Sequence, residues 1–373
     1  MKPKTVFFIF FGLFILIGLL SFFHQQSKNP AEDIFIEPIE QISKFVQTPA
    51  PSPENSKQLE EEIKISLDKI GINIDKIRKV KDSEHKHLVI DVPKDVSLIR
   101  CNHLVTQTVR REEYSVLNCI EVPQKKQIRF RIGKNDSLHL KITLRKSEDA
   151  IKIVGRVAII IDDFGYNSNG IVDKFLKCKK DLTFAVIPGL AYSREIGLNA
   201  LKKNKEVIIH LPFEPESNEK AEEIQIKSGM TEEEIIWQIE LARKSLPMAK
   251  GANNHQGSKA TADTEVMNVV AEYFSENSLY FIDSVTSSES QAYEAMIAEN
   301  VRTAERDVFL DEVDTVEYVR GQMQLLASRA IEKGKAIAIG HVRKNTLEAI
   351  NSMIPEFEEQ GIRFVKVTEL LEN

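Results

Sequence analysis

Acidic and histidine side chains in the second half of the chain follow apolar runs. In RVAIIIDDFGYN, five uninterrupted apolar residues lead directly into Asp162 and Asp163. Three histidines follow other apolar runs: His210 ends EVIIH, His255 lies in GANNHQGS, and His341 ends KAIAIGH. Carboxylates and imidazoles bind divalent metal ions and also transfer protons, so these five residues are suited to metal-assisted acid–base chemistry.

The apolar run before the two aspartates is typical of a strand buried on both faces, as in a parallel sheet. It is short for a helix, and Gly165 follows as a turn residue. Neighbouring residues on a strand point to opposite faces, so we expect one aspartate to point inward and the other to top the strand. The alternative is that an aspartate caps a helix, which would explain only one of the pair.

The segments that must position these residues alternate between two patterns from about residue 154 to 373. The strand-like runs are RVAIII, DLTFAVIP, EVIIHLP, AKGANN, LYFID, KAIAIGH and IRFVKV, and the amphipathic stretches include TEEEIIWQIELARKSL, TEVMNVVAEYFSEN and TVEYVRGQMQLLASRAIEKG. This alternation predicts an α/β fold with a parallel sheet. Its length favours an irregular TIM-like (β/α) barrel over a doubly wound open sheet. In either fold the carboxyl ends of the strands gather at one edge, where the aspartates and histidines should meet.

More polar residues lie at the same predicted strand ends. They are Asn253, Asn254, Ser258, Asp283, Arg302, Arg306, Asp307 and Asp311. We expect them to support the site or to bind substrate, although Asp283 could equally cap the next helix. A cation favours the charged form of a nearby carboxylate, so Arg302 or Arg306 could keep a catalytic base ionised; the alternative is a solvated arginine.

The order of these motifs resembles that of the divergent polysaccharide deacetylases, relatives of the NodB-type carbohydrate esterases. Six segments carry the resemblance: VAIIIDDFGYN, EVIIHLPFEP, GANNHQGS, LYFIDS, RDVFLDE and AIAIGH. They cover about residues 154–371 and leave the N-terminal part uncovered. The resemblance implies a distorted (β/α) barrel and metal-dependent removal of acetyl groups from an N-acetylated sugar.

The resemblance also implies individual roles. In the NodB-type pattern the first aspartate of an adjacent pair is the base and the second binds metal, which makes Asp162 the base and Asp163 a ligand. That pattern continues with two histidines four residues apart, whereas here His210 is followed by Glu214 in the second place. We therefore take His255 as the third ligand, with Glu214 as the alternative.

The late histidine of the pattern, a general acid, matches His341. The chain then reads GHVRK, without the proline and second histidine that often follow in the divergent family. In the implied reaction a divalent ion, with Zn²⁺ expected, polarises an amide carbonyl and activates a water. A carboxylate takes the proton of that water, and an imidazolium gives one to the leaving amine.

Two other functions stay open at this stage. One is an anchored glycan-binding or scaffold protein that has lost turnover, which the missing second histidine suggests. The other is a different metal hydrolase, such as a phosphoesterase. The net charge of −6 and the lack of zinc-finger spacing give no indication of nucleic-acid binding.

The N-terminus begins with an uncharged apolar run, Thr5–Phe23, that is close to the length needed to cross a bilayer as a helix. No small-x-small cleavage site follows it, and Lys2 and Lys4 favour a cytoplasmic N-terminus. We expect a transmembrane signal anchor over 5–23, with the rest of the chain outside the cytoplasm. A cleaved signal peptide is the alternative, and it leads to the same compartment.

A Pro- and Ser-rich linker over 24–57 and a small α+β domain over 58–148 are predicted between this anchor and the barrel domain over 154–373. QLEEEIKISLDKIGI and DVSLIRCNHLVTQTVRR have helical character, and HLVIDV, YSVLNCIEV, QIRFRIG and SLHLKITLRK are strand-like. No motif indicates what this domain does. Cys101 and Cys119 could form a disulfide in an oxidising compartment, and buried free thiols are the alternative.

Overall fold

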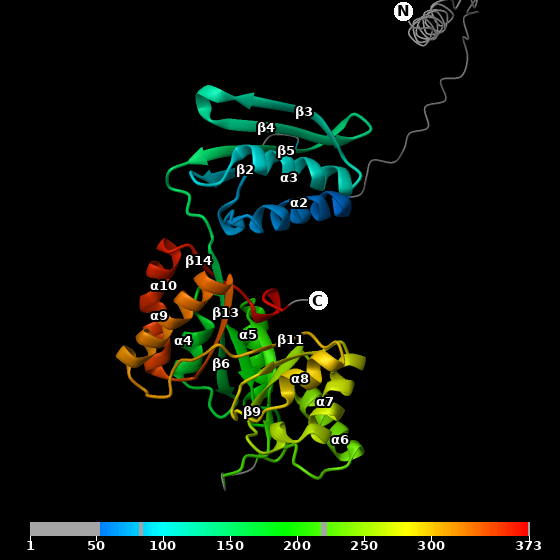
Figure 1. Cartoon of the computed structure of the whole chain (residues 1–373), viewed down its shortest axis with the longest axis vertical. Helices are drawn as coiled ribbons and strands as arrows, with labels where there is room; N and C mark the ends of the chain where they lie inside the picture. Colours follow the sequence, from blue (N-terminus) through cyan, green and yellow to red (C-terminus); the bar gives the residue numbers. More distant parts are fainter. Residues whose placement is uncertain (1–52, 82–84, 218–221, 372–373) are drawn as a thin grey trace, which may run out of the picture. The chain divides into compact units, whose positions relative to one another are not determined.

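The structure, a computed structural model, describes residues 53–81, 85–217 and 222–371 (Figure 1). The predicted signal anchor over 5–23 lies outside these residues, as does nearly all of the predicted linker, so both stay predictions. Within the described ranges, no helix is both long enough and apolar enough to cross a membrane.

A five-stranded sheet with two helices occupies the first part of the described chain (Figure 1). Its strand order is β1-β2-β5-β4-β3. The elements are α2 (Pro53–Asp68), η1 (Ile74–Lys76), β1 (Arg78–Lys81), β2 (Lys86–Pro93), α3 (Leu98–Arg111), β3 (Ser115–Val122), η2 (Pro123–Lys125), β4 (Gln127–Lys134) and β5 (Ser137–Ser147). Both predicted helices and all four predicted strands are confirmed. Strand β1 was not predicted, because RKVK has too few apolar residues to resemble a strand.

The core of this smaller sheet forms where the apolar stripes of α2 and α3 meet alternate strand residues. Ile63 of α2 and Val105 of α3 are buried in one cluster with Phe130 of β4. The three cysteines are free: Cys101 and Cys178 are buried and Cys119 is exposed. The disulfide offered as one possibility is therefore absent, and Cys119 does not fit the buried-thiol alternative either.

A second, nine-stranded sheet begins at Gly155, and its ladders are parallel. Its order is β11-β10-β9-β8-β7-β6-β13-β12, and β14 also pairs with β6. The strands are β6 (Gly155–Phe164), β7 (Thr183–Val186), β8 (Glu206–Phe213), β9 (Gly251–Gln256), β10 (Tyr280–Asp283), β11 (Thr303–Glu305), β12 (Val308–Phe309), β13 (Lys335–His341) and β14 (Ile362–Phe364). The predicted parallel α/β sheet is confirmed. The two short strands, β11 (3 residues) and β12 (2 residues), were missed because they are too short to show a strand pattern.

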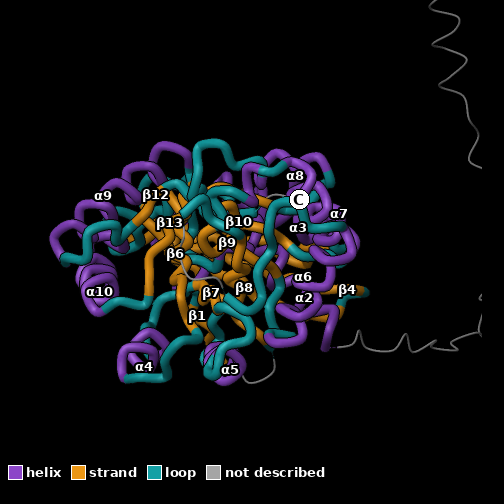
Figure 2. The backbone as a smooth tube through the Cα atoms, turned by 90° about the horizontal axis from the view of Figure 1, so that it is seen from below, coloured by secondary structure: helices purple, strands orange, loops and turns teal. Residues whose placement is uncertain are grey.

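Helices surround this larger sheet (Figure 2). They are α4 (Gly170–Leu176), α5 (Ser193–Lys202), α6 (Glu232–Ser245), α7 (Thr264–Glu276), α8 (Ala292–Ala298), α9 (Val316–Lys333) and α10 (Lys344–Glu359), with short 3-10 turns at η3 (Ala260–Ala262) and η4 (Val367–Glu369). Local chemistry sets where several of them begin. Thr231 and Glu234 form a capping box at α6, and the Asp263 side chain accepts backbone N–H groups at the start of α7.

The larger sheet curls until its two ends are close together. Strands β11 and β12 lie at opposite ends of the sheet, yet only Arg306 and Asp307 separate them in sequence. The Arg306 N–H donates to Asp283 O on one side, and the Asp307 N–H donates to Ile337 O on the other. Because two residues span only a few ångströms, the ends must adjoin. The described strands do not close this seam by pairing, so the sheet is barrel-like but less complete than a TIM barrel.

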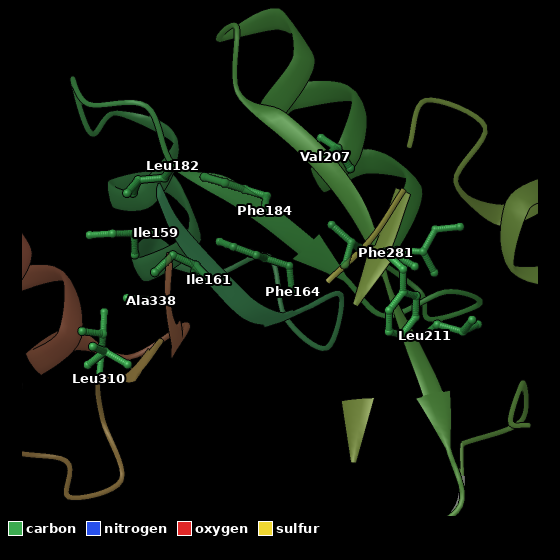
Figure 3. Close-up of a cluster of buried hydrophobic side chains, with 14 of the residues drawn as sticks. Ile159, Ile161, Phe164, Leu182, Phe184, Val207, Leu211, Phe281, Leu310 and Ala338 are labelled. Atoms are coloured by element: carbon green, nitrogen blue, oxygen red, sulfur yellow. The ribbon is translucent and has the colours of Figure 1, made fainter. Parts of the chain in front are cut away.

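Alternation along the strands divides the core of the larger sheet in two. Ile159 and Ile161 of β6 point toward the helices and pack in the outer cluster with Phe184 (Figure 3). Ala158 and Ile160 belong to a separate inner cluster with apolar residues of β8, β10 and β13. The inner face of the curled sheet is therefore a packed apolar core, and the next inward position on β6 is residue 162.

Candidate metal and catalytic site

Polar side chains point inward at the carboxyl ends of four strands, directly after the apolar residues of the inner cluster. Asp162 follows Ile160 by two residues on β6, and His210 follows Ile208 in the same way on β8. The register pairs His210 with Asn253 of β9 and His341 of β13 with Asp162. The predicted gathering of strand ends on one edge therefore occurs, and it places these residues directly above the apolar interior.

Three side chains converge at this edge: Asp163, His210 and His255. One potential ligand atom from each lies within 4.8 Å of the others. His255 Nδ1 is 3.0 Å from His210 Nε2, and Asp163 Oδ1 is 3.4 Å from each of these nitrogens. These are the three residues that the sequence analysis proposed as metal ligands.

The chemistry of this cluster fits a divalent ion. In a tetrahedral site with bonds of about 2.0–2.2 Å, neighbouring ligand atoms are roughly 3.3 Å apart, close to the separations here. Asp163 Oδ1 is buried and accepts no hydrogen bond from a described residue. Such an orphaned carboxylate oxygen is costly unless a cation balances it. Two nitrogens and one oxygen suit Zn²⁺ or a similar ion and leave a fourth position open.

The electrostatics of the cluster also favour positive charge at its centre. Burial alone would raise the pKa of Asp163, but the His210 and His255 side chains outweigh it and hold the pKa well below its usual range. Burial would lower the pKa of His210, yet the two aspartates raise it above its ordinary value. The aspartates therefore require a cation beside them, which either an imidazolium or a metal ion can supply.

The backbone at Asp163 explains how both aspartates reach one site. Its φ of 67° lies in the left-handed region, which is uncommon for a residue with a side chain. The ladder between β6 and β7 also shifts register between Ile161 and Phe164. The expectation that the two carboxylates diverge is thus wrong: Asp162 Oδ2 lies 3.6 Å and Asp163 Oδ1 lies 3.4 Å from the same His210 nitrogen. Gly165, with φ of 126°, continues the turn.

Asp162 is the more deeply buried of the pair, at 3% exposure. Burial raises the pKa of this carboxyl, and the positive charges of His210 and His341 only partly offset the effect. The Asn253 amide donates to Asp162 Oδ1 at 2.9 Å, which leaves Oδ2 toward the cluster. A carboxylate held in one orientation with a raised pKa has the properties of a general base.

His341 forms a pair with Asp311 across the mouth of the sheet. Its Nδ1 lies 2.8 Å from Asp311 Oδ1, and its backbone N–H donates to Oδ2 at 2.7 Å. Thr346 also donates to Oδ2, at 2.5 Å. Burial would lower the pKa of His341, but Asp311 raises it above its ordinary value. Nε2 lies 3.9 Å from Asp163 Oδ2, so the imidazole faces the cluster.

Several other predicted site residues hold loops instead of joining the cluster. The alternative ligand Glu214 pairs with Lys259 and accepts from the Ser228 backbone. Ser258 accepts from the Glu216 N–H. Asn254 accepts from the Ser284 N–H and so ties the end of β9 to the loop after β10.

Two of the predicted aspartates likewise have backbone roles. Asp283 accepts from the Val285 N–H and from Ser290, and it precedes α8 by too far to cap that helix. Asp307 pairs with Lys333 and accepts from the Ile337 N–H, which pins β12 against β13. Neither side chain contributes to the cluster.

The two candidate arginines lie at opposite ends of β11. Arg302 precedes the strand and stacks over the Tyr280 ring at the far end of β10. Arg306 follows the strand, donates to the carbonyls of Ser284 and Val285, and lies over the Phe309 ring at 5.0 Å. Burial lowers the pKa of Arg306 while the Asp162 charge opposes that effect, so Arg306 is the arginine whose charge acts on the candidate base.

Sequence reasoning missed three residues that organise this site. Ser284 lies 3.2 Å from the Asn253 amide, Thr346 contacts Asp311, and Arg343 donates to the Asp311 carbonyl at 2.6 Å. Ser284 could have been found from its position directly after β10. Thr346 and Arg343 lie on or just before α10, where the sequence pattern carries no such signal.

This combination of a curled parallel sheet and a histidine–carboxylate cluster at its strand ends corresponds to a known class. Residues 159–371 match the family described as divergent polysaccharide deacetylase, and the chain belongs to that family. The family resemblance found in the sequence is thereby confirmed.

Individual relatives cover the same part of the chain. The uncharacterized protein YibQ of Escherichia coli (strain K12) is 34% identical over 219 residues, which is 59% of this chain and 68% of YibQ. An uncharacterized protein of Haemophilus influenzae is 31% identical over 218 residues, 58% of this chain and 77% of that protein. The crystal structure of uncharacterized protein ATU2773 from Agrobacterium tumefaciens C58 has a TM-score of 0.55 at 20% identity, and covers 58% of this chain and 89% of that one. This last similarity concerns the fold.

Proposed function

We propose that this protein is a metal-dependent deacetylase that removes N-acetyl groups from a polysaccharide of the cell envelope. The observation that carries the proposal is the cluster of Asp163, His210 and His255, with Asp162 and His341 beside it. Membership of the divergent polysaccharide deacetylase family supports hydrolysis of an amide bond on a glycan.

The ligand cluster has a defined part in this proposal. Asp163, His210 and His255 would hold the divalent ion, which would supply Lewis acidity to the amide carbonyl and activate a water. The exposed fractions of their side chains differ: 3% for His210, 14% for His255 and 33% for Asp163. His210 therefore forms the floor of the site, and the other two open it to solvent and substrate.

Asp162 and His341 divide the proton transfers. Asp162 takes the proton of the attacking water at Oδ2, because Oδ1 is engaged by Asn253. His341 gives a proton from Nε2 to the leaving nitrogen, because Nδ1 is held by Asp311. The raised pKa of each group keeps a base and an acid available together, since the carboxyl is a stronger base and the imidazole stays protonated to higher pH.

A binding or scaffold protein without turnover is the second candidate. It is favoured by Glu214, which stands where the NodB-type pattern has a histidine and is engaged by Lys259. A phosphoesterase on the same cluster is a third possibility. His255 weighs against the scaffold, because its Nδ1 occupies the position that a third ligand would need.

The decisive experiment measures metal content and acetate release on one preparation of the full-length chain. Stoichiometric metal with acetate released from N-acetylated glycans supports the deacetylase. Metal without acetate release points to another hydrolase, and absence of both points to the scaffold. The His255→Ala variant is the matched control, since it should remove metal and acetate release together.

The same proposal places the globular part outside the cytoplasm, attached to the membrane by the apolar run Thr5–Phe23. Lys2 and Lys4 precede this run and favour retention of the N-terminus in the cytoplasm. An extracytoplasmic position would bring the strand-end site to glycans of the envelope.

A further inference from the structure

The smaller sheet has two unlike faces. Side chains of α2 and α3 bury one face, together with Leu88, Phe130 and Ile142. The alternate residues of the same strands point the other way. On this second face Arg129, Arg131 and Ile120 are exposed. The buried cluster that includes α2 and α3 lies on the first face.

Cations on this second face lie close together through the register of the strands. Arg131 of β4 is opposite Lys141 of β5 on one side and Asn118 of β3 on the other. Arg129, two residues along, is opposite Thr143 and Ile120. Neighbouring strands are about 4.8 Å apart and alternate residues about 6.8 Å apart, so these positive side chains form a compact array. Arg78 and Arg145 continue it toward β1 and β2.

The array is only partly neutralised. Asp91 pairs with Arg145 at 2.7 Å and with Arg78 at 3.3 Å. Arg129 donates to the neutral Gln127 amide at 3.2 Å, and no described carboxylate pairs with Arg129 or Arg131. Two uncompensated guanidinium groups side by side repel each other, and this occurs in a chain whose net charge is −6. An anionic partner would relieve the repulsion.

The shape and the other side chains of this face favour an extended, hydroxyl-rich partner. An open groove of about 580 Å³ runs over β1–β5, and Arg129, Arg131 and Lys141 contribute to its lining. Asn118, Gln127 and Thr143 also line the groove, and each lies opposite an arginine in the register of the strands. Guanidinium groups bind carboxylates bidentately, and amide and hydroxyl groups hydrogen-bond sugar hydroxyls.

Other polyanions fit this face less well. Proteins that bind single-stranded nucleic acid stack bases on exposed aromatic rings. Of the two rings that line the groove, Phe130 is 1% exposed, and the half-buried imidazole of His87 lies 3.0 Å from the Thr143 hydroxyl. Membrane-binding faces combine cations with a broad row of large apolar side chains. Here the apolar residues of the groove are interspersed with amides and a hydroxyl.

We propose that this basic face, centred on Arg129 and Arg131, binds an N-acetylated glycan whose repeating units carry carboxylates. The choice of a glycan rests on the proposed deacetylase function. The positive charge of the face then narrows the substrate class to an acidic polysaccharide. The face holds the polymer, while the strand-end site acts on its acetyl groups.

The test measures binding of the full-length chain to hyaluronan, a polymer of alternating N-acetylglucosamine and glucuronate. Binding should weaken as ionic strength rises from about 0.05 to about 0.3 M. The double variant R129Q/R131Q should raise the Kd for hyaluronan about tenfold or more, because two charge-assisted contacts are lost. R129K/R131K keeps the positive charges but loses the planar guanidinium groups that bind carboxylates bidentately. Its Kd for hyaluronan should therefore lie between those of the parent and R129Q/R131Q.

The controls separate this proposal from a folding defect and from failure of the proposed reaction. K202Q/K203Q removes two exposed cations from the end of α5 and should leave the Kd unchanged. Metal content and the far-UV circular dichroism spectrum of R129Q/R131Q should match those of the parent, which shows that the variant is folded. If no acetate is released from any glycan but hyaluronan binding still depends on Arg129 and Arg131, the proposed binding face is supported and the proposed deacetylase reaction is contradicted.

Two results would overturn the assignment of this face. One is a hyaluronan Kd that R129Q/R131Q leaves at the parent value. The other is tighter binding of poly(dT), or of vesicles rich in phosphatidylglycerol, than of hyaluronan at equal ionic strength. Either polyanion would then be the better partner for the array.

Discussion

Asp162 and His210 are joined by a single amide. The Asn253 Nδ2 lies 2.9 Å from Asp162 Oδ1, and the Asn253 Oδ1 lies 2.9 Å from His210 Nδ1. Because an ionised carboxylate only accepts, the amide nitrogen faces Asp162 and the amide oxygen faces His210. Neutral His210, the form that binds a metal ion, therefore carries its proton on Nδ1, which leaves Nε2 with a lone pair toward Asp163 and His255.

The first prediction follows from this bridge. Asn253→Ala should lower affinity for Zn²⁺ by roughly 10- to 100-fold, because His210 loses the partner that fixes its tautomer and orientation. Competition with a chelator measures the affinity. Ser258→Ala, which removes a hydroxyl that accepts from the Glu216 N–H, is the control and should bind like the parent. Parent-like affinity in Asn253→Ala would show that the bridge has no such effect.

A second prediction decides the third metal ligand. His255→Ala should abolish stoichiometric metal, because its Nδ1 is one of the three converging atoms. Glu214→Gln should retain full metal, because both carboxylate oxygens are engaged by Lys259 and Ser228. Elemental analysis of the two purified variants gives the answer. Loss of metal in Glu214→Gln, with retention in His255→Ala, would reverse the assignment.

A third prediction separates the two adjacent aspartates. Asp162→Asn should keep metal and fold but lose turnover by roughly 100- to 10,000-fold, the usual range for a general base. Asp163→Asn should lose metal first and activity as a result. Metal content and acetate release are measured on the same preparations. The roles are swapped if Asp162→Asn loses the metal and Asp163→Asn keeps it.

A fourth prediction concerns pH. If His341 acts as an acid, kcat should fall as pH rises through its pKa, which Asp311 holds above the ordinary value. Asp311→Asn removes the carboxylate that favours the charged imidazole, so the pKa falls and the alkaline limb of the profile moves to lower pH. The acidic limb, assigned to Asp162, should move less. An alkaline limb that stays in place would exclude His341 as its source.

The fifth prediction concerns topology. A reporter that is active only in the cytoplasm, fused after Asn373, should stay silent, because the run Thr5–Phe23 is expected to hold the remainder outside. A matched fusion in which Thr5–Phe23 is deleted should be active, since its chain then stays in the cytoplasm. Activity in the undeleted fusion would contradict the proposed location.

The local sequence pattern was sufficient to predict most of the strands of the larger sheet and their parallel arrangement. The apolar runs that end at Asp162, His210 and His341 identified their strands, because burial on both faces requires an unbroken apolar segment. The parallel arrangement followed from alternation with helices, and it placed the strand ends on one edge. The capping residues of α6 and α7 likewise act within a few residues of themselves, so the sequence carries that information locally.

Tertiary structure decided what depends on direction and register. Only the left-handed φ of Asp163 brings its carboxylate to the nitrogen that Asp162 also approaches. Arg302 and Arg306 are four residues apart in sequence, yet they lie at the amino and carboxyl ends of β11, so that only Arg306 lies at the edge of the sheet that carries the site. Strands β11 and β12 are too short to show a pattern of their own, so pairing with the neighbouring strands β10 and β13 defines them. These outcomes rest on contacts between residues distant in sequence, and a local pattern does not contain them.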